Sequence, residues 1–271
     1  MQTYTIKSGD TLRGIALKFY GDASKFVVIQ EANDIANPNQ ISVGQVLEIP
    51  DLADDNDNNP LENFHRAFPN SVRWRLAEDG VEIEGSGIER TSGQPATATK
   101  IWNNFSDEIN QWSKHFNVPA VIIIATIATE SNGKADAIRK EPGYVSDSIT
   151  PHLISVGLMQ TLISTARGTL HDSTIDRDDL KNASISIKAG TSFIADQRLK
   201  TLLDPPKVAC AYNAGSLFEN KNSNNRWRMR QFPIGTSAHC DRFIKFFNDA
   251  VFVLKGTTTP VSVGYQQFYL A

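Results

Sequence analysis

The first fifty residues combine two hydrophobic patterns. Alternating polar and apolar residues at positions 4–6 and 45–50 predict two short strands. Between them, apolar residues three or four positions apart predict one helix that ends near Tyr20 and a second over residues 24–33. The inward faces of these helices are expected to be Leu12, Ile15, Ala16 and Phe19, and then Phe26, Ile29 and Ala32. The order predicts a small βααβ unit.

A polar run separates this unit from the rest of the chain. Residues 51–60 are rich in Asp and Asn, offer almost no apolar surface to bury, and end in a proline that disfavours helix before it. They predict an acidic linker between a unit of residues 1–50 and a larger unit of residues 61–271. The overall fold class expected is α+β.

Residues 61–97 show strand patterns again. Residues 71–76 and 81–84 alternate on either side of Asp79-Gly80, a strong signal for a tight turn, and so predict a β-hairpin with a third strand near residues 87–91. These strands would either cover a helical core or form a lip beside a cleft. No catalytic pattern lies among them.

From residue 98 the pattern becomes helical. An apolar stripe predicts a core-facing helix and consists of Trp102, Phe105, Ile109, Trp112 and Phe116. Residues 120–131 are apolar on nearly every face, and their β-branched residues would also suit a buried strand. Their length, and Pro119 as a first-turn proline, favour a buried central helix.

Glu130 lies at the end of this apolar segment. A carboxyl group there should lose hydration, which raises its pKa and favours the protonated form that a general acid requires. A glutamate at a helix end also commonly serves as an exposed or capping group. Glu130 therefore becomes a candidate acid only if other residues join it.

Charge and composition narrow the function classes. The net charge is -3, and the first 60 residues contribute four basic and nine acidic side chains, so the remainder is mildly positive. This balance argues against a nucleic-acid binder. Two cysteines, Cys210 and Cys240, are too few for a disulfide framework or a zinc site, and we expect no metal or cofactor. We expect no transmembrane segment and no signal peptide, hence synthesis in the cytoplasm.

Two later segments join small residues to polar side chains that are able to hydrogen-bond a sugar. Residues 155–160 place Gly157 beside Gln160, and residues 208–215 place Tyr212 and Asn213 beside Gly215. Small residues permit close approach of the backbone to a ligand. Either segment alone is a weak signal.

The first unit resembles the LysM domain in Tyr-Thr-Ile-Lys-Ser-Gly-Asp-Thr-Leu at its start and Ile-Ser-Val-Gly-Gln-Val-Leu-Glu-Ile-Pro at its end. The resemblance implies binding of N-acetylglucosamine-containing glycans, namely peptidoglycan or chitin oligomers. The residues that it implies for the groove are Gly9, Asp10, Thr11 and Leu12 on one side and Asn39, Gln40 and Ile41 on the other. The alternative for Asp10 and Thr11 is a capping role at the first helix.

The second unit resembles the lytic transglycosylases and goose-type lysozymes of glycoside hydrolase family 23. The resemblance rests on Glu130-Ser131, Gly157-Leu158-Met159-Gln160 and Ala211-Tyr212-Asn213-Ala214-Gly215, and covers about residues 98–254. It implies a mainly helical, lysozyme-like domain, followed by a tail of residues 255–271. The implied substrate is the β-1,4 bond between N-acetylmuramic acid and N-acetylglucosamine.

The same resemblance implies roles for individual residues. Glu130 is the implied catalytic acid, and substrate contacts are implied for Ser155, Gly157, Leu158, Met159, Gln160, Tyr212 and Asn213. Of these, residues 157–159 should form the floor beside the sugar. The Tyr212 hydroxyl should donate to a substrate acetamide or to Glu130.

The second carboxylate that most glycosidases need is harder to find. Goose-type lysozymes carry an aspartate soon after Leu-Met-Gln, where this chain has Thr161 and Leu162. The remaining candidates, Glu141 and Asp147, lie in a loop expected to be exposed. The pattern therefore favours a single-acid lytic transglycosylase that forms 1,6-anhydro-muramic products. A lysozyme that adds water, and an inactive wall-binding or virion structural protein, remain the alternatives.

These expectations suggest a biological setting. We expect a monomer that acts at the bacterial cell wall, with peptidoglycan strands as its partner and no nucleic acid. Without a signal peptide, a phage endolysin released through a lysis pore, or a lysin carried in the virion, is the leading hypothesis.

Overall fold

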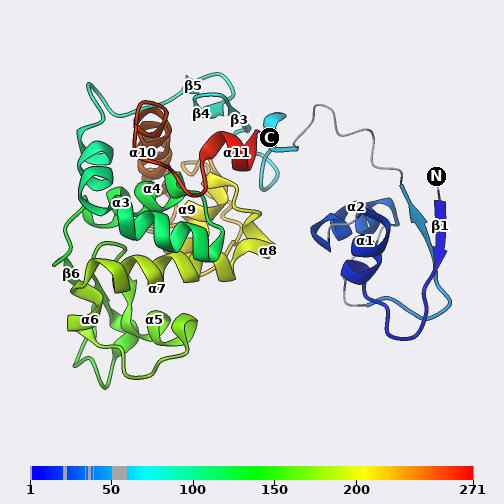
Figure 1. The fold of residues 1–271 in the computed structure, drawn as a ribbon, viewed down its shortest axis with the longest axis horizontal. Coiled ribbons are helices and arrows are strands. Elements are labelled where there is room, and N and C mark those ends of the chain that lie inside the picture. The colour runs from blue at the N-terminus through cyan, green and yellow to red at the C-terminus, as the bar shows by residue number, and fades with distance from the viewer. Residues whose placement is uncertain are drawn as a thin grey trace. The chain divides into compact units, whose positions relative to one another are not determined.

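The computed structural model describes residues 2–20, 23–33, 35, 38, 40–50 and 60–270. The chain divides into two compact units, Met1–Asn58 and Asn59–Ala271, which are described one at a time (Figure 1). Of the expected linker, residues 51–60, positions 51–59 lie outside the described residues and stay a prediction, while Pro60 begins a 3₁₀ helix of the second unit.

The first unit has the predicted βααβ order. Strand β1 (Gln2–Thr5) pairs antiparallel with β2 (Val46–Ile49), and two helices, α1 (Leu12–Tyr20) and α2 (Phe26–Ala32), lie between them in sequence. The short 3₁₀ helix η1 (Ala23–Lys25) joins the helices. The buried apolar core consists of Ile6, Leu12, Ile15, Ala16, Ile29, Leu47 and Ile49.

Two expectations for this unit need correction. The second helix begins at Phe26 rather than at residue 24, because residues 23–25 form the 3₁₀ turn. Ala32 is exposed rather than inward-facing. The following residue, Asn33, takes the place against β2: its side chain donates to the Glu48 carbonyl and accepts from the Glu48 N–H, both at 2.7 Å.

The second unit begins with the 3₁₀ helix η2 (Pro60–Glu62) and a small antiparallel sheet. Its strands, in the order β3-β4-β5, are β3 (Trp74–Ala77), β4 (Gly80–Ile83) and β5 (Gly87–Ile88). The hairpin prediction is confirmed, although the third strand is shorter than expected. Side chains from β3 and β4 belong to the main core and β4 contacts α10, so the sheet covers the helical core.

The main core surrounds α4 (Ala120–Ser131), which packs against α3 (Ala96–Phe116) and α10 (Ala238–Lys255). Every α4 residue except Glu130 is buried, which confirms the central helix and excludes the strand alternative. Pro119 is a correction: its backbone is extended (ψ 133°), so it precedes the helix instead of forming its first turn. Its fixed φ still starts the helix at the next residue.

A smaller lobe was not predicted. It contains the sheet β6-β7-β8, formed by β6 (Ile138–Lys140), β7 (Ile154–Val156) and β8 (Thr161–Leu162), with the turn η3 (Pro151–Leu153). Helices α5 (Ile163–Leu170) and α6 (Arg177–Lys181) complete it around a core of its own. Helix α7 (Ala183–Asp196) separates this lobe from α3, as Figure 1 shows.

The remaining helices are α8 (Arg198–Thr201), α9 (Pro205–Ala214) and α11 (Tyr265–Tyr269). The tail packs on the second unit: the Tyr265 hydroxyl donates to the Ala77 carbonyl and the Tyr269 hydroxyl to the Leu203 carbonyl. Asp204, directly before α9, is fully buried and accepts from Trp74 Nε1 and contacts His65 Nε2, both at 2.9 Å. Asp204 therefore ties residues 61–97 to the start of α9.

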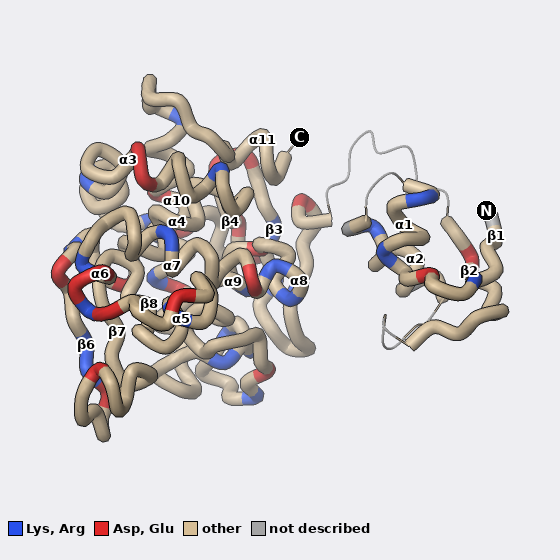
Figure 2. The backbone as a smooth tube through the Cα atoms, turned by 60° about the horizontal axis from the view of Figure 1, so that its bottom comes forward, with Lys and Arg blue, Asp and Glu red and all other residues tan. Residues whose placement is uncertain are grey.

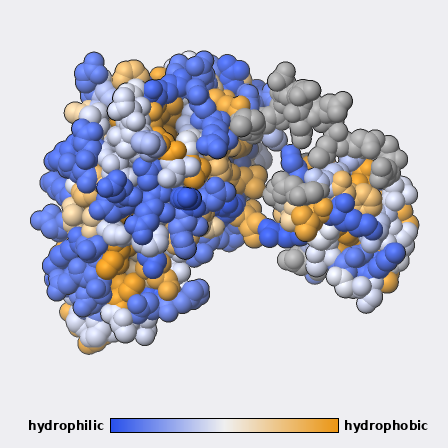
Figure 3. Space-filling model, in the orientation of Figure 1, coloured by the Kyte–Doolittle hydropathy of each residue, from blue (hydrophilic) through white to orange (hydrophobic). Residues whose placement is uncertain are grey.

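Surface properties agree with the composition. The Lys and Arg residues of the second unit are spread over many elements (Figure 2). The face seen in Figure 3 is largely hydrophilic, with hydrophobic residues in separate patches. Among the described residues, no helix has both the length and the apolar composition needed to cross a membrane.

Candidate active site

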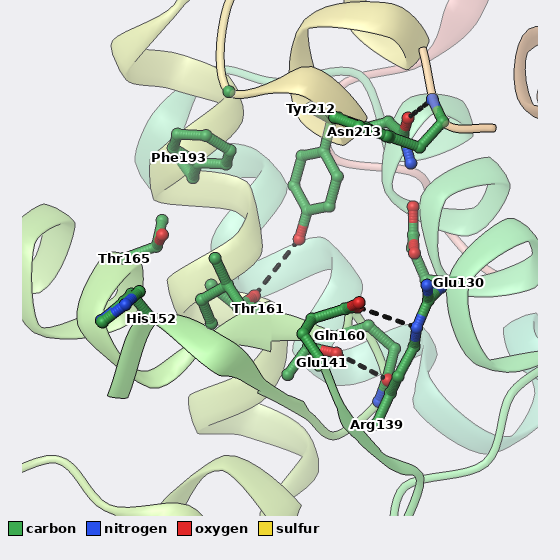
Figure 4. Close-up of a pocket in the computed structure, with 14 residues that line it drawn as sticks. Glu130, Arg139, Glu141, His152, Gln160, Thr161, Thr165, Phe193, Tyr212 and Asn213 are labelled. Atoms are coloured by element: carbon green, nitrogen blue, oxygen red, sulfur yellow. Dashed lines mark hydrogen bonds and ion pairs between the residues drawn. The ribbon is translucent and has the colours of Figure 1, made fainter. Parts of the chain in front are cut away.

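A cavity of about 430 Å³ opens in the second unit, where the end of α4 meets α9 and the small lobe. This volume lies within the range of about 300–1,000 Å³ found for small-molecule sites. Figure 4 shows Glu130, Glu141 and Tyr212 around the same space. The lining residues are Glu130, Arg139, Glu141, His152, Ser155, Gln160, Thr161, Leu162, Thr165, Phe193, Tyr212, Asn213, Gly215 and Phe232.

Glu130 is the second-last residue of α4, and only 17% of its side chain is exposed. Burial raises its pKa to about 7, against the opposing influence of the positive charges of Arg242 and Arg139. The rise that the apolar helix predicted is therefore present. A carboxyl group with this pKa holds its proton for a substantial fraction of the time at neutral pH, as a general acid must.

The end of α4 is held by the glycine-containing segment. The Ser131 hydroxyl donates to the Leu158 carbonyl at 2.7 Å, and Asn132 ends the helix in a left-handed conformation. Two motifs that lie 27 residues apart in sequence are thus in direct contact. This contact fixes where Glu130 enters the cavity.

Residues 157–159 lie behind the cavity wall and not on its surface, contrary to the expected floor. Leu158 and Met159 are fully buried, and neither they nor Gly157 is among the lining residues. Gly157 has φ +81°, and a Cβ atom there would lie 2.0 Å from the Leu180 carbonyl oxygen. The segment packs this tightly because its backbone carbonyls and N–H groups hold Ser131, Tyr212 and Ser186.

Gln160 and Ser155 line the cavity, but their side chains are engaged with the protein. Gln160 Nε2 donates to the Ala137 carbonyl at 2.8 Å and the Gly157 carbonyl at 3.0 Å, and Oε1 accepts from Ser155 Oγ at 3.0 Å. Gln160 also has a left-handed backbone (φ +47°), which is costly for a residue other than glycine. The amide therefore braces the small lobe beside the cavity.

Tyr212 and Asn213 reach the cavity from α9. The Tyr212 hydroxyl donates to the Met159 carbonyl at 2.8 Å and lies 3.2 Å from Thr161 Oγ1, so its proton is directed to Met159 and not to Glu130. Burial and the nearby Glu130 raise the pKa of Tyr212 strongly, which keeps the phenol neutral. Asn213 Oδ1 accepts from the Phe232 N–H and so fixes the facing loop.

The two candidates for a second carboxylate, Glu141 and Asp147, occupy different positions. Glu141 lines the cavity, and its Oε1 pairs with Arg139 Nε at 2.9 Å, while its side chain stays 36% exposed. Asp147 is not among the lining residues. Its carboxylate bonds Arg177 and accepts from Tyr144, and the Arg177 hydrogen bond is the main cause that lowers its pKa. Of the two, Glu141 alone faces Glu130 across the cavity.

Several lining residues were not singled out in the sequence, notably Arg139, His152, Phe193 and Phe232. Arg139 and Glu141 are two positions apart at the end of a strand, and period-two spacing places such residues on one face. That spacing was the available signal. His152 lies in the short 3₁₀ helix η3 and Phe232 in a loop, and hydrophobic periodicity gives no guide to segments of either kind.

In the first unit, the residues predicted to line the glycan-binding groove differ in their contacts and in their exposure. Thr11 Oγ1 accepts from the Gly14 N–H at 3.0 Å, so Thr11 caps α1, and Asp10 accepts from the Lys7 N–H and the Tyr4 hydroxyl at 2.8 Å. Leu12 is buried in the core, while Gly9 and Gln40 are exposed and Ile41 packs at the edge of the core. Asn39 lies outside the described residues.

Comparison with known proteins finds two domain families in this chain. The LysM domain matches residues 4–50, and the transglycosylase SLT domain matches residues 107–231. Both resemblances drawn from the sequence are thereby confirmed.

Matches to individual proteins are shorter. An esterase of Mycobacterium tuberculosis is 37% identical over 100 residues, which is 34% of this chain and 21% of the esterase. The potassium binding protein Kbp of Escherichia coli is 48% identical over 52 residues, 18% of this chain and 35% of that protein. An uncharacterized protein of Deinococcus radiodurans is 47% identical over 47 residues, 17% of this chain and 19% of its own length. The chain thus spans only a fifth to a third of these relatives, and their names describe them alone.

Proposed function

We propose that this chain, which carries a LysM domain followed by a transglycosylase SLT domain, cleaves the β-1,4 bond between N-acetylmuramic acid and N-acetylglucosamine in peptidoglycan. The LysM domain binds the glycan of the wall, and the second unit performs the cleavage. One observation carries the proposal: Glu130, with a pKa raised to about 7, lies at the edge of a cavity inside the transglycosylase domain.

The proposed reaction uses Glu130 twice. Its carboxyl proton goes to the glycosidic oxygen as the bond from that oxygen to C1 of the muramic acid breaks. The resulting carboxylate then takes the proton of the C6 hydroxyl, whose oxygen closes onto C1 to form a 1,6-anhydro ring. The proton balance returns Glu130 to its starting state, and no water is consumed.

The neighbours of Glu130 support this assignment by their chemistry. Burial disfavours the charged form before the reaction, while Arg139 and Arg242 stabilise the carboxylate once the proton has left. Asn213 uses its oxygen for the Phe232 N–H, so its Nδ2 group is the part of the amide directed to substrate in this proposal.

Glu141 supports a second candidate, hydrolysis. A second carboxylate in the same cavity suits a mechanism that activates water. Glu141 is held at the cavity by its 2.9 Å pair with Arg139, so it is the carboxylate placed to contact such a water. The products separate the two candidates, because hydrolysis leaves reducing ends and transglycosylation leaves anhydro ends.

The test uses purified sacculi with mass spectrometry of the released muropeptides. Removal of a general acid typically costs about 10²–10⁴ in rate, so we expect Glu130→Gln to lose about a thousandfold while still binding sacculi. Glu141→Gln should leave the yield of anhydro products unchanged, and Asp147→Asn is the matched control in the same loop. Full activity of Glu130→Gln would remove it as the acid, and purely reducing products that depend on Glu141 would establish hydrolysis. An unmutated protein that releases nothing would favour a wall-binding protein without catalysis.

A further inference from the structure

His239, on α10, contacts the proposed acid. It is the second residue of α10, only 4% of its side chain is exposed, and its Nε2 atom lies 3.6 Å from Glu130 Oε1. This distance exceeds that of a hydrogen bond, so the ring touches the carboxyl group without bonding it. His239 lies beyond the residues that match the transglycosylase domain.

The ring is fixed by a second helix. Its imidazole hydrogen-bonds to the backbone of Ala209 in α9, three residues before Tyr212. The two helices that carry His239 and Ala209 also pack against each other, and α10 packs along α4. The imidazole therefore has little freedom to move away from Glu130.

The charged and titratable groups around this contact come from every neighbouring element. Arg242 lies one turn further along α10, Arg139 and Glu141 come from the small lobe, and Tyr212 comes from α9. Burial, and secondarily the positive charge of Arg242, lower the pKa of His239 to about 4. The ring is thus neutral at the pH where Glu130 holds its proton.

The neutral state of the His239 ring matters because a charged ring would act on Glu130 in the opposite direction. A positively charged imidazolium 3.6 Å from Glu130 would stabilise the carboxylate and remove the proton that the acid must give. A water molecule in the same place would hydrate Oε1 with the same consequence. A buried neutral ring avoids both.

We propose that His239 is a positioning residue for Glu130, which excludes water from Oε1 and holds the carboxyl group toward the cavity without adding charge. The proposal rests on the function proposed above, but the pKa of Glu130 that it concerns is a property of the protein without substrate.

The experiment titrates Glu130 directly in the whole chain, by ¹³C NMR of labelled glutamate carboxyls, with Glu130→Gln to assign the signal. We expect His239→Ala to lower the pKa of Glu130 by about one pH unit, because water then reaches Oε1. His239→Asn, which leaves a smaller gap, should show a smaller fall and decides the matter if the alanine variant fails to fold. His239→Gln, neutral and closer in size, should restore most of the original value.

The control is Phe243→Leu, a buried position one turn along the same helix. It should lower stability and leave the pKa of Glu130 unchanged. An unchanged pKa in both His239→Ala and His239→Asn, or an equal fall in Phe243→Leu, would overturn the proposal.

Measurement of sacculus cleavage as a function of pH then separates the positioning role of His239 from the proposed function. The loss of activity at high pH should begin at a lower pH in His239→Ala than in the unmutated protein. If the NMR shift appears while the unmutated protein cleaves nothing, the positioning role stands and the proposed function fails. If cleavage depends on Glu130 but neither measurement responds to His239, the function stands and the positioning role fails.

Discussion

Asp10 in the first unit and Glu130 in the second are both carboxylates at helix ends, but their surroundings act in opposite directions. Asp10 precedes the N-terminus of α1 and accepts from the Lys7 N–H and the Tyr4 hydroxyl, which lower its pKa. Glu130 is near the C-terminal end of α4, where burial raises its pKa. The helix dipole favours negative charge at the first position and disfavours it at the second.

The difference follows from the size of the two cores. The first unit buries a small set of apolar residues, so its polar groups stay at the surface and form local turns and caps. The second unit has a core large enough to surround a whole helix and to desolvate one carboxyl group at its end. Polar groups at a surface suit the binding of neutral sugars. Proton transfer from a carboxyl group at neutral pH instead needs a core that removes that group from water.

Glycine substitution should show the largest contrast between the units. Gly9 and Gly157 have similar left-handed backbones, but a Cβ at Gly9 meets nothing within 4 Å and one at Gly157 meets the Leu180 oxygen. We expect Gly9→Ala to cost about 1 kcal/mol from the backbone alone. Gly157→Ala should cost about 4 kcal/mol, because overpacking adds to the backbone strain.

The two units can be followed separately in this measurement. All four tryptophans, at positions 74, 102, 112 and 227, belong to the second unit, so urea unfolding followed by tryptophan fluorescence reports Gly157→Ala. Amide hydrogen exchange reports Gly9→Ala. Equal losses at the two positions would mean that the segment around Gly157 relaxes freely.

The two carboxylates should give stability a pH dependence of opposite sign. Glu130 has a folded pKa of about 7 against 4.5 for the free group, so the folded unit keeps a proton that the unfolded chain releases between these values. Stability of the second unit therefore falls as pH rises through this window, by about 3 kcal/mol in total. Glu130→Gln should be about that much more stable above pH 7 and equal below pH 4.5, as measured by tryptophan fluorescence.

Asp10 provides the opposite case. Because its folded pKa is lowered, its stabilisation is present above the unfolded value of 3.8 and is lost as pH falls through the folded value. Asp10→Asn should therefore lower the stability of the first unit at neutral pH and have a smaller effect on it in acid.

A Glu130→Gln variant with no gain in stability at high pH would show that the Glu130 carboxyl group is better hydrated than its burial indicates.

The smallest predicted effect concerns Thr11. Loss of its cap in Thr11→Ala should cost the first unit about 1 kcal/mol, measured by hydrogen exchange. If Thr11 also contacts glycan, binding of chitin oligomers or sacculi should fall further than this loss of stability explains. Thr11→Ser, which keeps the cap, is the control, and unchanged binding in both variants would limit Thr11 to capping.

Local patterns explain which parts of the fold were predicted. The βααβ order follows from hydrophobic periodicity within ten to twenty residues, whereas α4 follows from the length of its apolar segment and the proline before it. The sheet of the small lobe escaped prediction because its strands are two or three residues long and β6 lies fourteen residues before β7. Such short strands leave too few positions for an alternation to be read.

Prediction of the site residues was limited in the same way to what local sequence patterns carry. Glu130 was predicted from its apolar neighbours together with the resemblance carried by the later motifs, which also nominated Tyr212 and Asn213. The hydrogen bond from the Gln160 amide to the Ala137 carbonyl and the contact of His239 with Glu130 join residues from distant segments. Sequence spacing carries no record of such contacts.

Asp204 bears on how the second unit can be shortened for practical use. The match to the transglycosylase domain begins at residue 107, but Asp204 draws its partners His65 and Trp74 from before that point. A chain that begins at residue 98 would remove both of these partners and leave the buried Asp204 carboxylate only Lys207, at the place where α9 starts toward Tyr212. An engineered lysin built on this domain should therefore keep residues 60–97, which contribute no residue to the cavity wall yet anchor the helix that does.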